Sequence, residues 1–363
     1  MERYLIQTAF TACICCLNHI ASWIQANMED IQHFSSRLID IPSITGNETK
    51  IAYFLRDYLS EKGMSVNLMP VISDRFNVYA TFSDDPVILL TTHMDTVAPF
   101  FPARIDNGSL YGRGSCDAKG IIASMIYALL GLEDNFKKNV GLLFVVGEEV
   151  DSIGAKTAAK NSAQPKFLIN GEPTENKLVH AQKGTYLFEV TAKGKSAHSG
   201  YPEYGLSAIH IMLQYLDRLQ KHTWPENKTL GKTLLNIGKI NGGDAINSLA
   251  SSARAECCIR IVSSAEDIEG TLNSLLIDGV EIHTYSASDP VKLYCPPEIK
   301  ETISVNYGSD VFHLQAGGAQ LLMQGPGTIL NAHKEDEHIL ISDLNQAVKC
   351  YQDLIRILMD QHV

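Results

Sequence analysis

The stretch that decides the fold is PVILLTTHMDT, residues 86–96. Its short run of Val, Ile and Leu, opened by Pro86, predicts a central strand that is buried on both faces of a parallel sheet. His93 and Asp95 follow with one residue between them, and residues i and i+2 of a strand project to the same side. Because open α/β sheets bind ligands beyond the carboxyl ends of their strands, we expect both side chains to face one crevice.

Two further apolar segments end in acidic residues. NVGLLFVVGEE ends in Glu148 and Glu149, and KFLINGEPT carries Glu172 just after its apolar part. Adjacent carboxylates at the exit of a buried strand repel each other unless a cation lies beside them. An isolated His-x-Asp pair is also compatible with a solvated strand end, and one of the paired glutamates with a solvated side chain. The repetition over separate strands favours a shared cation.

Asp117 lies in SCDAKG, just before a helical run rich in small residues. An Asp in this place is most often the N-cap of the helix, which is the alternative to a role as a ligand. The preceding segment contains the pair Asn107-Gly108, which is typical of a tight hairpin turn.

The length of 363 residues is enough for two domains. Residues 28–182 and 291–363 alternate apolar strands with amphipathic helices, which predicts an α/β domain built on a doubly wound, mixed sheet. Residues 183–290 have a different pattern, in which half-exposed strands and two helices follow in the order strand, helix, strands, helix, strand. We interpret this segment as an α+β domain inserted into the first one.

Residues 1–27 precede the first clearly patterned helix and form an N-terminal extension of uncertain status. Their apolar run is interrupted by Gln7 and Asn18, and it is too short and too polar to span a bilayer. A cleaved secretory signal is one explanation, since an apolar stretch lies near the start. An extension that precedes the true start near Met28 is the alternative that we favour.

Composition excludes some classes of partner. The formal net charge is −11, so no basic excess exists that could neutralise nucleic-acid phosphates. Nothing in the sequence points to a membrane partner. The eight cysteines are scattered without a CxxC pair, which argues against a zinc ribbon or a disulfide framework. We therefore expect a cytoplasmic protein with reduced thiols.

The candidate ligands combine imidazole with carboxylate and include no thiolate. This donor set is typical of zinc, cobalt or manganese at a catalytic site. Five protein ligands are too many for one open catalytic ion, but they suit two divalent ions that share a bridging carboxylate and a water. The five are His93, Asp117, Glu149, Glu172 and His333.

The motifs HMDT, GRGSCDAKG, GEE, GEPT, SAHSGYP, GSD, and GPG followed by AHKEDE resemble those of one enzyme family. It is the family of acetylornithine deacetylase, succinyl-diaminopimelate desuccinylase, aminoacylase and carboxypeptidase G. The resemblance runs from about residue 29 to the C-terminus. It implies a zinc-peptidase-like catalytic domain with an inserted, ferredoxin-like lid and dimerisation domain.

The resemblance also implies roles for the ligands. One metal ion would be held by His93, Asp117 and Glu172, and the other by Asp117, Glu149 and His333, with Asp117 as the bridge. Asp95 would orient His93 and fix its tautomer. Glu148 would be the general base that activates the water.

Residues of the inserted domain and of the following segment would contact the substrate. By resemblance, His198 would reach across a homodimer to the oxyanion. Arg260 would bind the α-carboxylate of the substrate, although a surface position on a strand edge is the alternative. Asn247 matches only in part, because NSLA replaces the usual Asn-Val-Ile-Pro run, and the Asp often found before the arginine-containing pair is absent. Gly308 and Ser309 would line the rim.

The expected function is hydrolysis of the amide bond of a small N-acyl amino acid, as in acetylornithine deacetylase. A di- or tripeptidase of the same superfamily is the main alternative, because it would share the metal ions and differ in the pocket. A non-catalytic homologue would be signalled by a lost ligand or a lost Glu148, and the sequence has lost neither.

Overall fold

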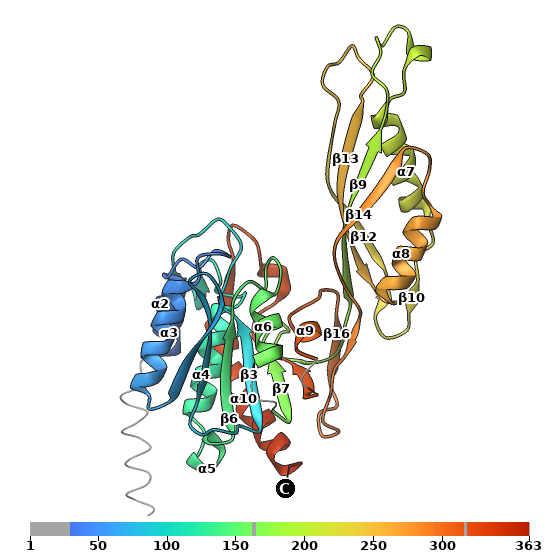
Figure 1. The fold of residues 1–363 in the computed structure, drawn as a ribbon. Coiled ribbons are helices and arrows are strands. Elements are labelled where there is room, and N and C mark those ends of the chain that lie inside the picture. The colour runs from blue at the N-terminus through green and yellow to red at the C-terminus, as the bar shows by residue number, and fades with distance from the viewer. Residues whose placement is uncertain (1–29, 162–164, 316–317, 363) are drawn as a thin grey trace, which may run out of the picture.

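Two bodies of different size make up the chain in the computed structural model, which describes residues 30–161, 165–315 and 318–362. The larger body contains both ends of the described chain, and the smaller one projects from it (Figure 1). The predicted extension, residues 1–27, lies outside the described residues. Within the described ranges, no helix combines the length and the apolar character that crossing a membrane requires.

A six-stranded sheet forms the centre of the large domain. Its order is β1-β2-β6-β3-β7-β17; β6, β3, β7 and β17 are parallel to one another, and β2 is antiparallel to both of its neighbours, β1 and β6. The mixed sheet that the sequence predicts is therefore confirmed. The strands are β1 (Ser65–Ile72), β2 (Arg75–Thr81), β3 (Ile88–His93), β6 (Val140–Val145), β7 (Phe167–Asn170) and β17 (Gln320–Met323).

Helices cover both faces of this sheet. One face packs against α2 (Ile31–Ile39), α3 (Thr49–Glu61), α4 (Lys119–Leu130) and α10 (Ile341–Asp360). The other face packs against α6 (Ile153–Asn161) and α9 (Val311–Leu314). Along β3, Ile88 and Leu90 belong to the first core and Leu89 to the second. Every residue of β3 is buried, as expected for a strand covered on both sides.

Smaller elements complete the large domain. A three-stranded sheet contains β15 (Val291–Lys292), β8 (Leu178–Gln182) and β16 (Thr302–Val305), and another contains β18 (His338–Leu340), β5 (Ser109–Tyr111) and β4 (Arg104–Asp106). The predicted hairpin joins β4 to β5, and Asn107 and Gly108 both have positive φ, as a tight primed turn requires. Two short helices are α5 (Asp134–Lys137) and η3 (Ile329–Asn331).

The small domain is a four-stranded antiparallel sheet with two helices on one face. The chain order is β9 (Gly184–Lys193), α7 (Ala208–Lys221), β12 (Leu234–Gly242), β13 (Ser252–Ile261), α8 (Ala265–Ser274) and β14 (Val280–Ser288). The sheet order β12-β13-β9-β14 makes it ferredoxin-like. Along β9, buried residues that face the helices alternate with half-buried ones. The remaining elements are η1 (Pro202–Tyr204), β10 (Glu226–Asn227) and β11 (Gly231–Lys232).

Candidate metal centre and substrate pocket

The candidate site lies at the carboxyl edge of the six-stranded sheet. Strands β6, β3 and β7 are neighbours there and run in the same direction. His93 ends β3, Glu148 and Glu149 follow β6, and Glu172 follows β7. The order of the strands therefore brings side chains that are up to 79 residues apart in sequence to one edge. The hydroxyl of Thr92, just before His93, donates to the carbonyl oxygen of Gly171, just before Glu172.

Asp117 lies between the two candidate histidine ligands. Its Oδ1 is 2.9 Å from His93 Nε2, and its Oδ2 is 3.3 Å from His333 Nε2. His333 Nε2 also lies 3.1 Å from Glu149 Oε1. Ligand atoms of His93, Asp117 and Glu149 all fall within 4.8 Å of one another. Each oxygen of Asp117 thus faces a different histidine, which is the arrangement that a bridging carboxylate needs.

Burial perturbs the acidity of the two glutamates in this group. It raises the carboxyl pKa of both Glu148 and Glu172 well above the ordinary value, because a buried carboxylate loses hydration, and the nearby acids add repulsion. Burial also favours the neutral form of Asp117. The hydrogen bonds from His333 and His93 outweigh that effect and lower the pKa of Asp117.

The histidines respond in the opposite sense. Burial disfavours the charged form of His93, but hydrogen bonds to Asp117 and Asp95 raise its pKa well above the ordinary value. Hydrogen bonds to Asp117 and Glu149 raise the pKa of His333 to about 10. The acidic cluster thus favours positive charge at both imidazoles, and divalent cations would supply positive charge at the same place. The donor set of nitrogen and oxygen atoms therefore fits such ions.

Asp95 lies behind the ligand cluster and supports it. Its Oδ1 accepts hydrogen bonds from the backbone N–H groups of Gly147 (2.9 Å) and Glu148 (3.1 Å), and its Oδ2 accepts one from Glu149 N–H (3.2 Å). His93 Nδ1 lies 3.0 Å from the Asp95 carbonyl oxygen and 3.6 Å from Oδ1. The expectation that both side chains face one crevice is wrong for Asp95, because β3 ends at His93 and the alternation of a strand ends with it.

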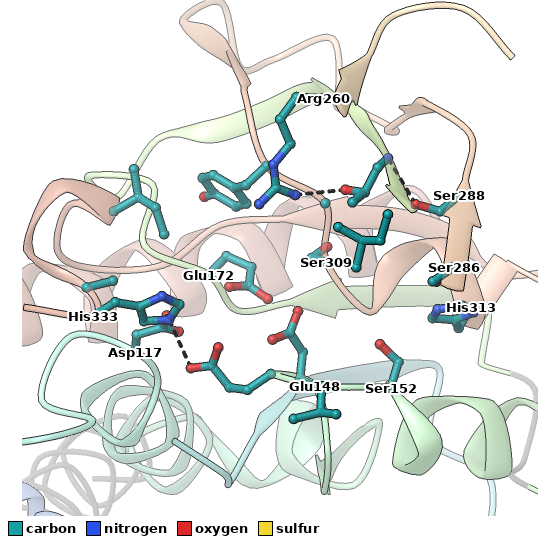
Figure 2. A pocket seen from close by; sticks show the side chains of 18 residues that line it. Asp117, Glu148, Ser152, Glu172, Arg260, Ser286, Ser288, Ser309, His313 and His333 are labelled. Atoms are coloured by element: carbon teal, nitrogen blue, oxygen red, sulfur yellow. Dashed lines mark hydrogen bonds and ion pairs between the residues drawn. The ribbon is translucent and has the colours of Figure 1, made fainter. Parts of the chain in front are cut away.

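A pocket of about 370 Å³ opens above the cluster, between the two domains (Figure 2). The large domain contributes Asp117, Glu148, Glu149, Glu172 and His333 to it. Gly308, Ser309 and Tyr307 line its side, and Ser309 Oγ donates to Gln182 Oε1 at 2.7 Å. Arg260 of the small domain lies across the pocket from Glu148 and Glu172 (Figure 2).

Strand register builds the wall that carries Arg260. Arg260 on β13 pairs with Thr185 on β9, and Thr185 pairs with Ser288 on β14. Residues paired in this way project to the same face of a sheet. The guanidinium Nη1 of Arg260 donates to Thr185 Oγ1 at 2.7 Å, which holds it over the pocket. The alternative of a surface arginine on a strand edge does not apply, because β13 is an inner strand.

The sequence model of peptidase family M20/M25/M40 matches residues 89–357, which include all five candidate ligands. The chain belongs to this family. It is therefore a hydrolase of the metallopeptidase type, and the resemblance noted in the sequence is confirmed at the level of the M20 family. The α/β catalytic fold is confirmed with it.

Sequence relatives agree with this M20 assignment, and a solved structure shares the fold. A "Peptidase M20 domain-containing protein" of Schizosaccharomyces pombe is 40% identical over 334 residues, covering 88% of this chain and 82% of the relative. A "Probable carboxypeptidase" of Aspergillus clavatus is 35% identical and covers 93% and 92%. The crystal structure of a tripeptidase from Staphylococcus aureus has a TM-score of 0.75 at 23% identity and covers 90% of this chain and 97% of that one.

His198 and Asn247 are not brought to this pocket within the M20 chain. Both are exposed in loops at the end of the small domain that points away from the large one (Figure 1). The two loops contact each other, since Ser199 N–H donates to the Asn247 carbonyl oxygen at 3.0 Å. The proposed roles of both residues therefore require a second chain.

The sequence interpretation missed several pocket residues of the M20 chain. Thr185, Ser286 and Ser288 line the upper wall, and His313 lies at one end of the pocket. For Thr185, Ser286 and Ser288, the available signal was the alternation of buried and exposed residues along β9 and β14. That alternation separates the face that packs on the helices from the face that carries these three side chains. No sequence motif marked His313 as a pocket residue. Desolvation, with a smaller contribution from Lys156, lowers its pKa to about 4.

Proposed function

We propose that this M20 family member hydrolyses the amide bond of small N-acyl amino acids, in the manner of acetylornithine deacetylase. The observation that carries the proposal is Arg260, which lies opposite the acidic cluster in a pocket of about 370 Å³. A guanidinium pairs well with a carboxylate, so it would hold the α-carboxylate of a substrate whose amide carbonyl reaches the metal centre.

We assign one metal ion to His93, Asp117 and Glu172, and the other to Asp117, Glu149 and His333. The positions of the two histidines on either side of Asp117 support this division. Zinc suits the donor set best, and cobalt and manganese are compatible with it. When bound, the two ions would supply a Lewis acid for the amide carbonyl and would acidify a water molecule.

Glu148 is the proposed general base. Its carboxyl group projects into the pocket between Glu172 and Ser152 (Figure 2). It would accept the proton of the attacking water, and the same carboxyl group would return that proton to the leaving nitrogen. Asp95 would hold the turn that carries Glu148 and Glu149, through the three N–H groups it accepts.

The pocket also suggests what the acyl side of the substrate carries. The carboxylates among its lining residues, Asp117, Glu148, Glu149 and Glu172, all belong to the proposed catalytic centre. A free ammonium group on the substrate would have no other anionic partner in this lining. An uncharged acyl group therefore fits the remaining serine, threonine and apolar side chains better.

A peptidase acting on short peptides is the second candidate. The names of a relative, a probable carboxypeptidase, and of a similar solved structure, a tripeptidase, favour it. A carboxypeptidase would also use Arg260 for the substrate carboxylate. It would differ in accepting a peptide instead of a simple acyl group on the other side of the scissile bond.

We further propose a cytoplasmic homodimer in which residues 183–290 act as lid and dimerisation domain. Tyr201 and Tyr204 in the loop that carries His198, and Ile246 in the loop that contacts it, have exposed side chains, and such apolar exposure favours contact with another chain. In that dimer, His198 and Asn247 would reach the partner's pocket. The described cysteines are all unpaired, which agrees with a reducing compartment.

A substrate panel tests the proposed function. N-acetyl and N-succinyl amino acids, dipeptides and tripeptides would be assayed with added zinc, cobalt or manganese. Each compound would be compared with the derivative in which its α-carboxylate is replaced by an amide. We expect turnover of N-acyl amino acids and loss of that turnover for the α-amides and in Arg260→Met. Preferred cleavage of peptides would favour the second candidate, and equal cleavage of acids and amides would refute carboxylate recognition by Arg260.

A further inference from the structure

Glu337 is a buried carboxylate outside the proposed ligand set. Its Oε1 accepts hydrogen bonds from the backbone N–H groups of Gly114 (3.0 Å), Cys116 (3.1 Å) and Asp117 (3.1 Å). Its Oε2 accepts one from Arg113 Nη1 at 2.6 Å. The Arg113 and Glu337 side chains are only 2% and 0% exposed. Among the described residues, the donors to this carboxylate therefore all come from the segment that ends at Asp117.

Convergent buried N–H groups of this kind need an acceptor between them. Buried backbone donors that lose their acceptor are costly, and a carboxylate oxygen can accept several at once. The turn at residues 114–117 is thus shaped around Oε1 of Glu337. Because the N–H of Asp117 itself is one of the donors, this contact directly sets the position of the Asp117 backbone.

Glu337 also belongs to the loop that carries His333. The segment from His333 to Glu337 leads directly into β18, which pairs with β5. The Glu337 carbonyl oxygen accepts a hydrogen bond from Gly112 N–H at 3.1 Å. His333 is exposed and has a left-handed φ of 62°, a backbone conformation that persists only where the surrounding structure fixes it. Glu337 therefore links the loop that ends at Asp117 to the loop that carries His333, and the side chains of these two residues meet at Asp117 Oδ2.

We propose that Glu337, together with Arg113, is a positioning residue of the metal centre, because it sets the distance between Asp117 and His333. The inference rests on the proposed metal ligands and does not depend on the substrate. Supporting groups around metal ligands typically change metal affinity about 10- to 100-fold when they are replaced. A residue that merely stabilises the fold would lower stability without that change.

The test is zinc affinity of the full-length chain, measured by competition with a chromogenic chelator. Glu337→Gln keeps the shape and one acceptor oxygen, but it leaves the Arg113 charge without its partner. We expect this variant to bind zinc about 10- to 100-fold more weakly. Glu337→Asp keeps the negative charge but places it farther from the N–H groups, so a smaller loss of zinc affinity is expected. The double variant Arg113→Met/Glu337→Gln removes the unpaired charge and should recover part of the affinity.

Leu354→Ala is the matched control, because Leu354 is a buried core residue of α10 in the same domain. It should lower the urea midpoint of the metal-free chain without changing zinc affinity. Unchanged zinc affinity in Glu337→Gln, with only a lower midpoint, would overturn the proposal. If Glu337→Gln fails to fold, Glu337→Asp decides by the same criterion.

The outcomes also separate this role from the proposed function. A wild-type chain that binds no zinc would overturn the metal centre and the role of Glu337 with it. A wild-type chain that binds zinc but cleaves none of the panel would overturn the proposed function alone, and the affinities of the Glu337 variants would still be informative.

Discussion

At the scale of single residues, Glu148 is partly buried at the pocket, and desolvation and nearby acids raise its carboxyl pKa well above the ordinary value. A carboxyl group of this kind can hold and release a proton near neutral pH more readily than an exposed glutamate. It is also distinct from the side chains that contact the histidines, since no hydrogen bond joins it to Asp117 or His333 among the described residues. These properties suit a proton carrier beside the proposed metal ligands.

Glu148→Gln tests that role. The amide keeps the shape but cannot accept the proton, so we expect kcat to fall by about 10²- to 10⁴-fold. Bound metal, measured by atomic emission, should remain near the wild-type amount. Ser152→Ala, another change in the pocket lining, serves as the control and should keep most of the turnover. Near-normal turnover of Glu148→Gln would refute the role as base.

The lowered pKa of His313 predicts how the stability of the fold depends on pH. Burial, and secondarily the charge of Lys156, lowers its pKa to about 4 from an ordinary value of 6.5. As the pH falls from 6.5 to 4, the unfolded chain takes up a proton that the folded chain refuses, so the fold loses stability. Because the side chain is partly exposed, we expect a loss on the order of 1–2 kcal/mol.

Urea unfolding of the metal-free chain at several pH values measures this effect. His313→Gln should flatten the decline between pH 6.5 and 4 relative to the wild type. Lys156→Gln should flatten it only slightly, because the charge of Lys156 is the smaller cause. Parallel curves for the wild type and His313→Gln would show that His313 does not titrate in this way.

At the scale of elements, the strand that ends at His93 explains both a success and an error. The apolar run of β3 predicted a fully buried strand, and the structure confirms this. The strand geometry does not extend to Asp95, whose carboxylate instead accepts the N–H groups of the turn after β6. The strand could be recognised from its apolar sequence, but the residue at which it ends depends on contacts with the turn after β6.

Asp95→Asn tests the support that this turn receives. Asparagine offers one acceptor oxygen and places an NH₂ group toward N–H donors, so the turn that carries Glu148 and Glu149 should shift. We expect zinc affinity to fall about 10- to 100-fold, as for other groups that support ligands. Thr45→Val removes only the hydroxyl that contacts Asp95 Oδ2 and should have a smaller effect. Equal affinities of Asp95→Asn and the wild type would contradict this role.

At the scale of the whole molecule, the pocket exists only because two domains meet. Acidic side chains of the large domain form one wall, and Arg260, Thr185 and Ser288 of the small domain form the other. The connections between the domains are short, from β8 to β9 and from β14 to β15. His198 lies at the opposite end of the small domain, so one chain cannot deliver it to its own pocket in this arrangement.

A mixing experiment tests the proposed dimer. His198→Ala and Glu148→Gln should each be nearly inactive alone. When the two variants are unfolded together and refolded, about half of the dimers should be mixed, and each of these has one intact site. Activity should then recover to about a quarter of the wild-type value. No recovery, although mixed dimers are detected by mass, would show that His198 does not act across the dimer.

The sequence by itself determined the local features of this protein: the buried strands, the helices, the hairpin at Asn107-Gly108 and the kind of candidate ligand that follows each strand. These depend on periodicity and on residue chemistry within a few positions. Only the tertiary structure decided that Arg260 reaches the pocket from an inner strand, that Asn247 and His198 do not, and that Glu337 holds the Asp117 turn. The physical reason is that these contacts join distant segments, and their geometry depends on strand register and on how the two domains pack.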